Sequence, residues 1–597
     1  MSRVRYREGS RFFAYEDEER AHEGEESIAA GLDGDELWTD PDFQPGPRSI
    51  FRVPDTASMR SHGLVRWRRF LIEDLASALS APIAQGDLGN SYLVNALSLI
   101  GRSKSLLQQI VLSLANAAKG IYTFRLSLEG SWVYVHVDSY LPCRTHGELV
   151  FARSLYGNPL CSFIEKACAK LFGCYEALTH GTIDQALHLF SPSMAVEWLR
   201  FESELAEEEA CDEVWSRIEE GLAYEGGKVG CLRTLPDPYS ESVQDRRGIE
   251  LDQVYEVLAV FVAEAAATLE YDAITVGLVC VRAVQSPEVG MGMFEGRWSA
   301  GHELWRQFPF IHATVRAKTD AIIDNLLPGG SSKKPETHGV FWMQIEDFVE
   351  SFNRLVIDHD PALLPHYRHT RFPIHLTPMV HAEPQSDQPI HQSCTEYLSS
   401  GKSPSFPIHV VEKSFLSVHI FQKDNRLRDG IATYPSDSYF WSNIRAPSTR
   451  EAVLEQSLCY SNAIGAAVLR LEERDGAWVG ESTAQVLPML GASCNTKGFV
   501  LPPGFYAIIP LAVGSSSDSI GLSLSVCLNP LCIEFLNSVN IIQNMPVLAV
   551  KTTVLKKYEK WEWHEDSTIL SVGGLYAEIA EMYDGLQLKK NNDISVV

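Results

Sequence analysis

The sequence is poor in basic residues and lacks the closely paired cysteines that bind zinc. Its 51 lysines and arginines face 77 aspartates and glutamates, which gives a formal net charge of −26. Proteins that bind nucleic acid need a basic surface, so this balance argues against that class of function. None of the 12 cysteines belongs to a C-x-x-C pair, so we expect no zinc site. Scattered cysteines of this kind also favour a reducing compartment.

Long apolar runs, a secretory signal and EF-hand loops are also absent. No apolar run approaches the roughly 20 residues of a membrane-spanning helix, and the first residues lack the apolar core of a signal peptide. The pattern D-x-D-x-D-G-x5-E of a calcium-binding EF-hand does not occur. These absences favour a cytoplasmic protein and exclude a calcium-binding module of that kind.

The chain does have enough apolar and aromatic residues for several packed cores. It is 597 residues long, with 45% hydrophobic and 10% aromatic residues, which predicts three or four domains. Residues 1–36 are charged and acidic, so we expect a mobile extension there. Residues 361–405 are rich in histidine and proline and are typical of a linker. Their histidines fit no standard metal-ligand spacing, which favours a solvated loop.

The stretch from residue 85 to residue 100, QGDLGNSYLVNALSLI, has the clearest chemical pattern. Two glycines precede an apolar run of helical spacing, and Asn90 is a candidate N-cap. The pattern predicts a tight turn that opens a buried helix, with Ser91 in its first turn. A helix N-terminus stabilises an anion, so a nucleophile would fit there. On composition alone, an ordinary core helix after a loop is the simpler interpretation.

Periodicity predicts further elements along the chain. We expect a hairpin over residues 122–137, helices over 163–175 and 197–225, and strands over 254–263 and 273–284. From residue 407 onward, short strands separated by turn residues predict an antiparallel sandwich. After residue 531, VLAVKTTVL predicts one more strand and LYAEIAEMYDGL predicts a helix.

Several long motifs together resemble the calpain family of papain-like cysteine peptidases. They are Q-G-x-L-G-[D/N]-x-[aromatic]-L at 85–93, W-V-x-V-x-V-D-x-x-L-P at 132–142, G-E-L-x-F at 147–151, E-K-A-x-A-K-L-x-G-C-Y-E-A-L at 165–178 and G-x-F-W-M-x-x-x-D-F at 339–348. The segments 415–430 and 499–510 resemble landmarks of the β-sandwich that follows the calpain core.

The resemblance implies an α+β fold, with a papain-like protease core of two subdomains followed by an antiparallel, C2-like β-sandwich, calpain domain III. The expected ranges are a charged extension at 1–36, a helical subdomain at 37–195, a β-rich subdomain at 196–360, a linker at 361–405, the sandwich at 406–530, and at 531–597 an extension that completes the sandwich or begins a partial further domain.

The resemblance also implies that the catalytic triad is degenerate. Ser91 stands where the family has its cysteine nucleophile, and Gln253 stands where the histidine of H-A-Y-x-V belongs. Ala283 stands at the asparagine of R-N-P-W-G, whereas Gln85 matches the glutamine that helps to bind the oxyanion. Without a base and an orienting amide, a serine hydroxyl is a poor nucleophile.

Two further positions agree with this interpretation. A weaker alignment of the histidine motif offers Asp272, so histidine is absent in either alignment. Gln285 replaces the tryptophan that shields the histidine–asparagine pair in the family. The resemblance therefore implies an inactive pseudo-peptidase.

The calcium ligands that the resemblance implies are also missing. Calcium needs clustered carboxylate and carbonyl oxygens. The family's acidic positions fall at Pro82, Met291, Ala300, His338 and Val340. We therefore expect no metal and no cofactor in the protease core.

Two functions from different classes remain open. The first is a non-catalytic scaffold of the kind found among kinetoplastid-type calpain-like proteins, with protein partners that include cytoskeletal proteins and with weak lipid contact through the sandwich. The net acidity weakens the lipid option. The second is an active endopeptidase that uses Ser91 with another base, for which His180 and His188 are the nearby candidates.

Overall fold

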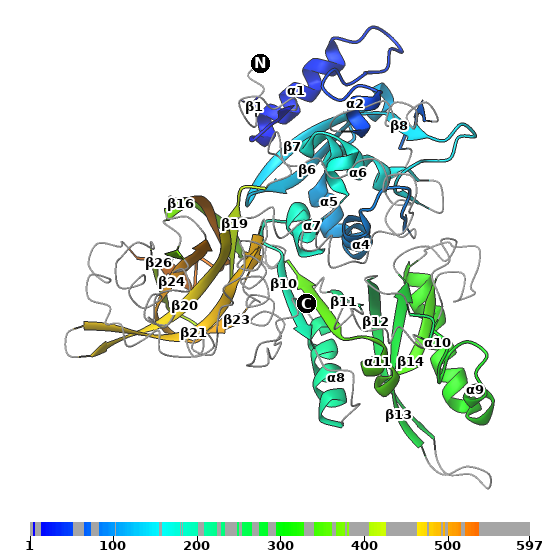
Figure 1. Ribbon diagram of the computed structural model, residues 1–597, viewed down its shortest axis with the longest axis vertical. Helices are drawn as coiled ribbons and strands as arrows, with labels where there is room; N and C mark the ends of the chain where they lie inside the picture. Colours follow the sequence, from blue (N-terminus) through cyan, green and yellow to red (C-terminus); the bar gives the residue numbers. More distant parts are fainter. Residues whose placement is uncertain are drawn as a thin grey trace, which may run out of the picture.

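Figure 1 shows the computed structural model of the chain, in which two lobes of mixed helix and strand lie beside an all-β unit. We call residues 38–194 the first lobe, 195–360 the second lobe and 366–536 the β unit. The structure describes residues 4–5, 13–51, 65–72, 83–101, 103–154, 158–179, 181, 183–200, 208–223, 228–232, 247–249, 254–265, 274–283, 294–326, 339–360, 366–376, 379–380, 405–424, 462–474, 477–490, 493–495, 499–514 and 520–536.

The first lobe packs two fully buried helices against a three-stranded antiparallel sheet. Residues 92–100 of one helix and all of 160–172 of the other are buried, as expected for helices in the centre of a lobe. The sheet has the order β5-β6-β7, and the predicted hairpin over 122–137 and helix over 163–175 are confirmed within a few residues. The elements are α4 (Ser91–Ile100), α5 (Lys104–Ile110), α6 (Leu160–Phe172), α7 (Ile183–Phe190), β5 (Val111–Ser113), β6 (Ile121–Leu128) and β7 (Ser131–Asp138).

Short elements complete this part of the chain. Two small sheets pair β3 with β8 and β4 with β9, and the second of these lies at the entrance to α4. The bounds are β1 (Val4–Arg5), β2 (Phe13–Ala14), α2 (Pro47–Ile50), β3 (Arg66–Arg69), β4 (Ile83–Ala84), β8 (Tyr140–Cys143) and β9 (Arg153–Ser154), with 3-10 turns η2 (Ala117–Lys119) and η3 (Tyr175–Leu178).

The N-terminal extension folds onto the first lobe. Helix α1 (Glu18–Ala30) packs against β6 and β7, and its Glu25 side chain is only 2% exposed. That carboxylate accepts hydrogen bonds from Ser113 Oγ at 3.0 Å, Asn116 Nδ2 at 3.0 Å and Thr123 Oγ1 at 2.6 Å. The expectation of a mobile extension is therefore wrong for residues 13–36. An acid-rich composition indicated solvation, but one of these acids is held in the interior by three donors.

The second lobe is built on one six-stranded antiparallel sheet with helices on both faces. Its strand order is β10-β15-β11-β12-β13-β14. Alternate residues of β13 enter two different cores, because Val279 and Val281 pack with α8 and α11 whereas Leu278 and Cys280 pack with α10. The elements are β10 (Ala195–Arg200), α8 (Glu208–Ala223), β11 (Lys228–Leu232), β12 (Tyr255–Ala265), β13 (Ile274–Ala283), α9 (Leu304–Gln307), α10 (Pro309–Leu326), β14 (Val340–Gln344), α11 (Ile345–Ser351) and β15 (Arg354–His359).

The structure divides the helix predicted over residues 197–225. Residues 195–200 form β10, which pairs with β15 from Ala195↔His359 to Arg200↔Arg354. In the described part of the predicted range, residues 208–223 form helix α8. The prediction is wrong for the first part because pairing with a strand more than 150 residues away overrides the local preference. The predicted strands over 254–263 and 273–284 are confirmed as β12 and β13.

The β unit consists of two sheets around one hydrophobic core. One sheet has the order β16-β25-β19-β22 and the other has the order β21-β20-β24-β18-β26, and both contribute to the same cluster of buried aliphatic side chains. The strands are β16 (Arg368–Leu376), β17 (Met379–Val380), β18 (Phe406–Val410), β19 (Ser414–Gln422), β20 (Asn462–Arg474), β21 (Ala477–Leu490), β22 (Ser493–Asn495), β23 (Phe499–Leu501), β24 (Gly504–Gly514), β25 (Ile520–Leu528) and β26 (Ile533–Phe535).

The β unit begins earlier than the sequence predicts. Strand β16 lies inside the range assigned to the linker, and it pairs along its whole length with β25, from Arg368↔Leu528 to Leu376↔Ile520. Its histidines and proline led to the linker assignment, although a sheet edge tolerates both. At the other end, the predicted strand and helix after residue 536 lie outside the described residues. Within the described part, no helix combines the length and the hydrophobicity of a membrane span.

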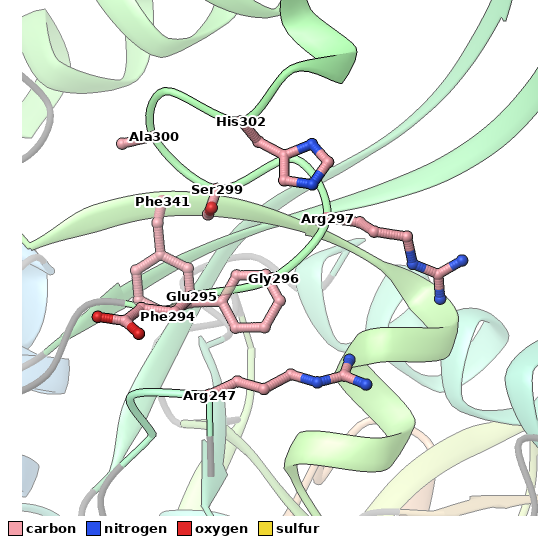
Figure 2. Close-up of a pocket in the computed structure, with 9 residues that line it drawn as sticks. All are labelled: Arg247, Phe294, Glu295, Gly296, Arg297, Ser299, Ala300, His302 and Phe341. Atoms are coloured by element: carbon pink, nitrogen blue, oxygen red, sulfur yellow. The ribbon is translucent and has the colours of Figure 1, made fainter. Parts of the chain in front are cut away.

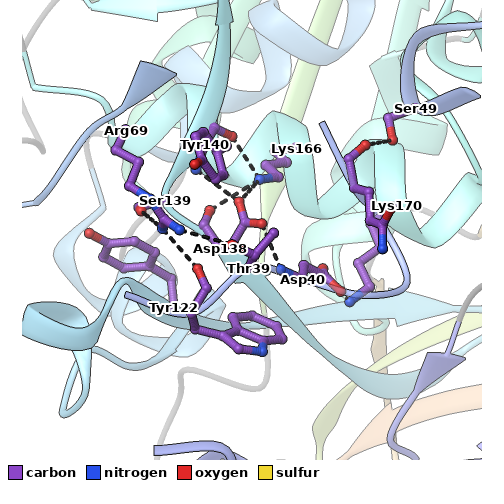
Figure 3. A network of polar contacts seen from close by, with 12 residues as sticks. Thr39, Asp40, Ser49, Arg69, Tyr122, Asp138, Ser139, Tyr140, Lys166 and Lys170 are labelled. Atoms are coloured by element: carbon purple, nitrogen blue, oxygen red, sulfur yellow. Dashed lines mark hydrogen bonds and ion pairs between the residues drawn. The ribbon is translucent and has the colours of Figure 1, made fainter. Parts of the chain in front are cut away.

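A chain of buried ion pairs holds α6 to the sheet of the first lobe (Figure 3). Lys166 Nζ donates to Asp138 Oδ1 at 2.5 Å, and Lys170 Nζ donates to Asp40 Oδ2 at 2.6 Å. The two pairs are linked because the Asp40 backbone N–H donates to Asp138 Oδ2 at 2.7 Å. Burial lowers the pKa of the Lys166 ammonium, and the nearby Asp138 carboxylate opposes that shift. These charges lie inside the lobe, so they position the strand and helix that frame the nucleophile segment.

Candidate active site

The loop before α4 is held by close backbone contacts. An added Cβ at Gly86 would lie 2.2 Å from the carbonyl oxygen of Val150, so no larger side chain fits there. The adjacent Asp87 N–H donates to that same oxygen at 2.8 Å. Gln85 Nε2 donates to the Leu88 carbonyl at 2.6 Å. The oxyanion-type glutamine is thus present at the predicted turn, with its amide bonded to its own loop.

Ser91 is the first residue of α4, as the sequence predicts. Its side chain is partly exposed, and within the described ranges its hydroxyl makes no hydrogen bond. The position places the hydroxyl beside the positive end of the helix dipole. A nucleophile at this point would be stabilised as an anion, but it would still need a base to remove its proton.

Asn90 stands at the N-cap position but does not cap the helix with its side chain. Its Nδ2 instead donates to Glu165 Oε1 at 2.7 Å, while the Ala152 N–H donates to Glu165 Oε2 at 3.0 Å. Both Asn90 and Glu165 are at most 1% exposed. Sequence reasoning missed this contact, which attaches α6 to the start of the nucleophile helix.

Burial raises the pKa of the Glu165 carboxyl to about 7, although the hydrogen bonds from Asn90 and Ala152 oppose the shift. Protonation is accommodated locally, because the buried Asn90 Oδ1 has no hydrogen-bond partner among the described residues. Rotation of the Asn90 amide would turn this oxygen toward a protonated Glu165. The raised pKa means that the folded state binds a proton here more tightly than the unfolded chain does.

We therefore expect Glu165→Gln to change how stability depends on pH. The carboxyl contributes stability that is fully present below its unfolded pKa of 4.5 and is lost as pH rises through about 7. The parent should lose about 3 kcal/mol of unfolding free energy across this window. The unfolding free energy of the glutamine variant should change less with pH. At about pH 8 the variant should be more stable than the parent, because it buries no charge. Urea-dependent hydrogen exchange in peptides of the first lobe, followed at several pH values, measures both slopes. Parallel slopes would show that Glu165 does not carry the effect.

The predicted asparagine position lies at the end of β13 in the second lobe. Ala283 is 4% exposed, pairs with Tyr255 across the β12–β13 ladder, and donates its N–H to the Gly339 carbonyl at 2.9 Å. Its methyl group offers no hydrogen bond to an imidazole. Ser91 and Ala283 belong to different lobes, because Ser91 begins α4 of the first lobe and Ala283 ends β13 of the second; Figure 1 shows the two elements. Gln253, Asp272 and Gln285 lie outside the described residues.

Of the two alternative bases, the described residues include His188 and not His180. His188 is 3% exposed, and its Nε2 is 3.0 Å from the Met194 carbonyl. Its ring packs edge-on against His419 and Phe421 of the β unit, with centroid distances of 5.3 and 5.6 Å. His188 therefore belongs to the contact between the first lobe and the β unit.

The described part of the predicted calcium region contains a cationic pocket instead. A cavity of about 600 Å³ lies beside the 294–302 loop and includes Ala300. Figure 2 shows Arg247 and Arg297 on one side of the stacked Phe294 and Phe341 rings. Neither a methyl group at residue 300 nor the apolar side chain of Val340 can ligate calcium.

Both arginines form ion pairs with the buried carboxylate of Asp347. Asp347 is 0% exposed, and its Oδ1 accepts Arg247 Nη1 at 2.5 Å and Arg297 Nη2 at 3.0 Å. Arg247 Nη2 also pairs with Glu350 at 2.9 Å. In the described part of this region, guanidinium groups therefore pair with both acids. The remaining implied positions, Pro82, Met291 and His338, lie outside the described residues.

Sequence reasoning missed this arginine pair. Asp347 is the aspartate of the F-W-M-x-x-x-D-F motif, but its partners come from two other segments, so no local spacing links the three residues. Across the ranges that the structure describes, no group of three or more histidine, cysteine or acidic side chains is arranged to hold a metal ion.

Comparison with known proteins agrees with this architecture. Residues 38–359 match the family described as calpain family cysteine protease. The chain is 28% identical over 341 residues to the calpain-1 catalytic subunit of Sus scrofa, which covers 55% of this chain and 42% of that protein. It is 23% identical over 462 residues to the calpain-type cysteine protease ADL1 of Oryza sativa subsp. japonica, which covers 72% of this chain and 19% of that protein.

A third relative gives the same result. The calpain-type cysteine protease DEK1 of Zea mays is 25% identical over 341 residues, which is 54% of this chain and 14% of that protein. The chain therefore spans less than half the length of these curated relatives. The family match covers more than half of the chain and includes the segments of Ser91 and Ala283. The chain belongs to the calpain family of cysteine proteases.

Proposed function

We propose that this chain is a non-catalytic member of the calpain family that works as a scaffold or regulatory binding protein. The observation that carries the proposal is the pair Ser91 and Ala283. A hydroxyl stands at the helix N-terminus where the family places a thiol, and a methyl group stands where the family places an amide. The fold of the protease core is kept while two groups of the reaction are replaced.

The replacements remove different parts of the mechanism. A serine hydroxyl has a pKa far above neutrality and attacks a carbonyl only when a base takes its proton. Glutamine at residue 253 cannot take and return a proton near neutral pH, and Ala283 cannot orient a histidine. Loss of one triad group costs about 10⁴-fold in rate, and such losses are not independent.

The binding role follows from the parts that are kept. The two lobes and the β unit, which we interpret as the C2-like domain III sandwich, offer extended surfaces to protein partners, among them cytoskeletal proteins in the cytoplasm. The arginine pair on Asp347 makes a calcium requirement unnecessary in the second lobe. A net charge of −26 limits contact with acidic lipid surfaces to a weak one.

An active-site probe tests the proposal. The full chain is incubated with a fluorophosphonate probe and, in parallel, with casein. We expect no labelling of Ser91 and no casein cleavage above that of the Ser91→Ala variant, because nothing activates the hydroxyl. Labelling that disappears in Ser91→Ala would overturn the proposal and would establish an active hydrolase that uses Ser91 with another base.

A further inference from the structure

Three buried side chains meet where the two lobes join. Asp360 Oδ2 accepts the Ser191 hydroxyl at 2.5 Å, and Asp360 Oδ1 accepts the Ser193 hydroxyl at 2.5 Å. We call these three residues the junction cluster. Each of them is at most 2% exposed. Both carboxylate oxygens are thus engaged by hydroxyl donors, and hydrogen bonds to a charged acceptor are stronger than neutral ones.

The junction cluster stands at both crossings of the chain between the lobes. Ser191 and Ser193 follow α7, the last helix of the first lobe, and lead into β10. Asp360 follows β15, the last strand of the second lobe, and the first pair of the β10–β15 ladder is Ala195↔His359. The outgoing and returning segments are therefore tied at the same point.

Strand β15 is shared between the two cores. Val356 packs in the core of the first lobe, together with Val196 of β10. Leu355 and Ile357, on the opposite face of the same strand, pack in the core of the second lobe. Because side chains alternate along a strand, any rotation of one lobe must move β15 against the other lobe. Asp360 lies at the end of this shared strand.

The β unit also contacts the part of the first lobe that leads into the junction cluster. The Asp360 carboxylate lies near enough to Cys527 of β25 that its charge adds to burial in raising the pKa of that thiol. In α7, the helix that precedes Ser191, the His188 ring packs against His419 of β19. A second contact is made at the β6–β7 turn, where the Glu129 carbonyl accepts Arg371 Nε at 3.2 Å. Figure 1 shows α7, β10 and β19 converging at the centre of the molecule.

From this arrangement we infer that Asp360 is a positioning residue that fixes the orientation of the two lobes and couples it to docking of the β unit. The two serines hold the outgoing segment, the carboxylate ends the shared strand, and the β unit packs against α7, the helix that precedes the two serines. Release of Asp360 frees all three parts together, so a change at the β unit is transmitted to the lobes through this cluster.

Hydrogen exchange on the full chain tests the inference. In Asp360→Ala, amide exchange in residues 195–200, 354–359 and 520–528 should become faster by about tenfold or more in all three segments. The helix α6 and the β12–β13 ladder should keep the exchange rates of the parent. Small-angle scattering should show a larger radius of gyration for the variant, because the lobes and the β unit separate.

Two further variants make the test specific. The double variant Ser191→Ala, Ser193→Ala should speed up amide exchange in the same three segments. Combining it with Asp360→Ala should increase exchange little further, because the three residues act as one unit. Ser162→Ala is the matched control: it removes a buried hydroxyl that donates to the Ala152 carbonyl at 2.7 Å, away from the junction. Faster exchange in only one of the three segments, or an equal response in Ser162→Ala, would overturn the inference.

Discussion

Asp138→Ala should destabilise the first lobe more than any surface substitution in it. The change leaves the Lys166 ammonium, whose side chain is 0% exposed, with two carbonyl acceptors among the described residues, Asp138 O at 3.1 Å and Tyr140 O at 2.7 Å. It also removes the acceptor of the Asp40 N–H. Breaking a buried ion pair by removing one partner typically costs about 3–5 kcal/mol. We expect a loss of that size.

The measurement must follow the first lobe rather than the whole chain, because proteins with several cores do not unfold in one step. Urea-dependent hydrogen exchange in peptides from β7 and α6 reports the free energy of unfolding of this lobe. The variant should recover part of its loss at alkaline pH, since a neutral lysine amine is less costly to bury than an ammonium.

Two comparisons separate the ion pair from a general loss of packing. The double variant Asp138→Ala, Lys166→Met should be more stable than Asp138→Ala alone, because no unpaired charge stays buried. Glu148→Ala removes an exposed acid that pairs with Arg153 at 3.2 Å, and it should cost less than about 1 kcal/mol. If the double variant were as unstable as the single one, the buried charge would not be the cause.

Local pattern is sufficient for the elements that depend on near neighbours. The hairpin of β6 and β7 and the helix α6 follow from alternation and helical spacing in one continuous segment. The start of α4 follows in the same way, from the two glycines at residues 86 and 89 and the helical spacing of the apolar residues after them. These predictions use residues that contact one another within the segment.

The errors arise where distant segments decide the structure. Residues 197–200 lie in the predicted helix, but pairing with β15 places them in a sheet. Residues 368–376 have linker composition, but β25 pairs with all nine of them. At the site, the contacts Asn90–Glu165 and Arg297–Asp347 join residues that are 75 and 50 positions apart. Spacing along the chain holds no information on such pairs.

The same limit applies to the catalytic positions. The motif resemblance assigned Ser91, Gln253 and Ala283 one at a time, and the structure adds that Ala283 pairs with Tyr255, two residues after Gln253. It also adds that His188 contacts the β unit. The resemblance identifies which groups are replaced, whereas the fold shows which remaining side chains have other partners.

Restoring the triad should produce the largest change in activity. We expect Ser91→Cys alone to leave casein cleavage at the background level of the parent chain, because a thiol at the start of α4 still lacks a base. Adding Gln253→His and Ala283→Asn supplies a base and an amide to orient it. The triple variant should cleave casein about 10³-fold faster than Ser91→Cys, since each triad group is worth about 10⁴-fold only when the others are present.

Matched variants show what limits the reaction. Thermal unfolding checks that Asn is tolerated at residue 283, which is 4% exposed. Gln85→Ala in the triple variant should lower the new activity by about 10²-fold, because it removes an oxyanion donor. Cleavage by Ser91→Cys alone would mean that a base is already present, and the proposed pseudo-peptidase would be wrong. A folded but silent triple variant would mean that the lobes do not bring residues 91 and 253 together, so that the loss of activity lies in lobe orientation as well as in the replaced side chains.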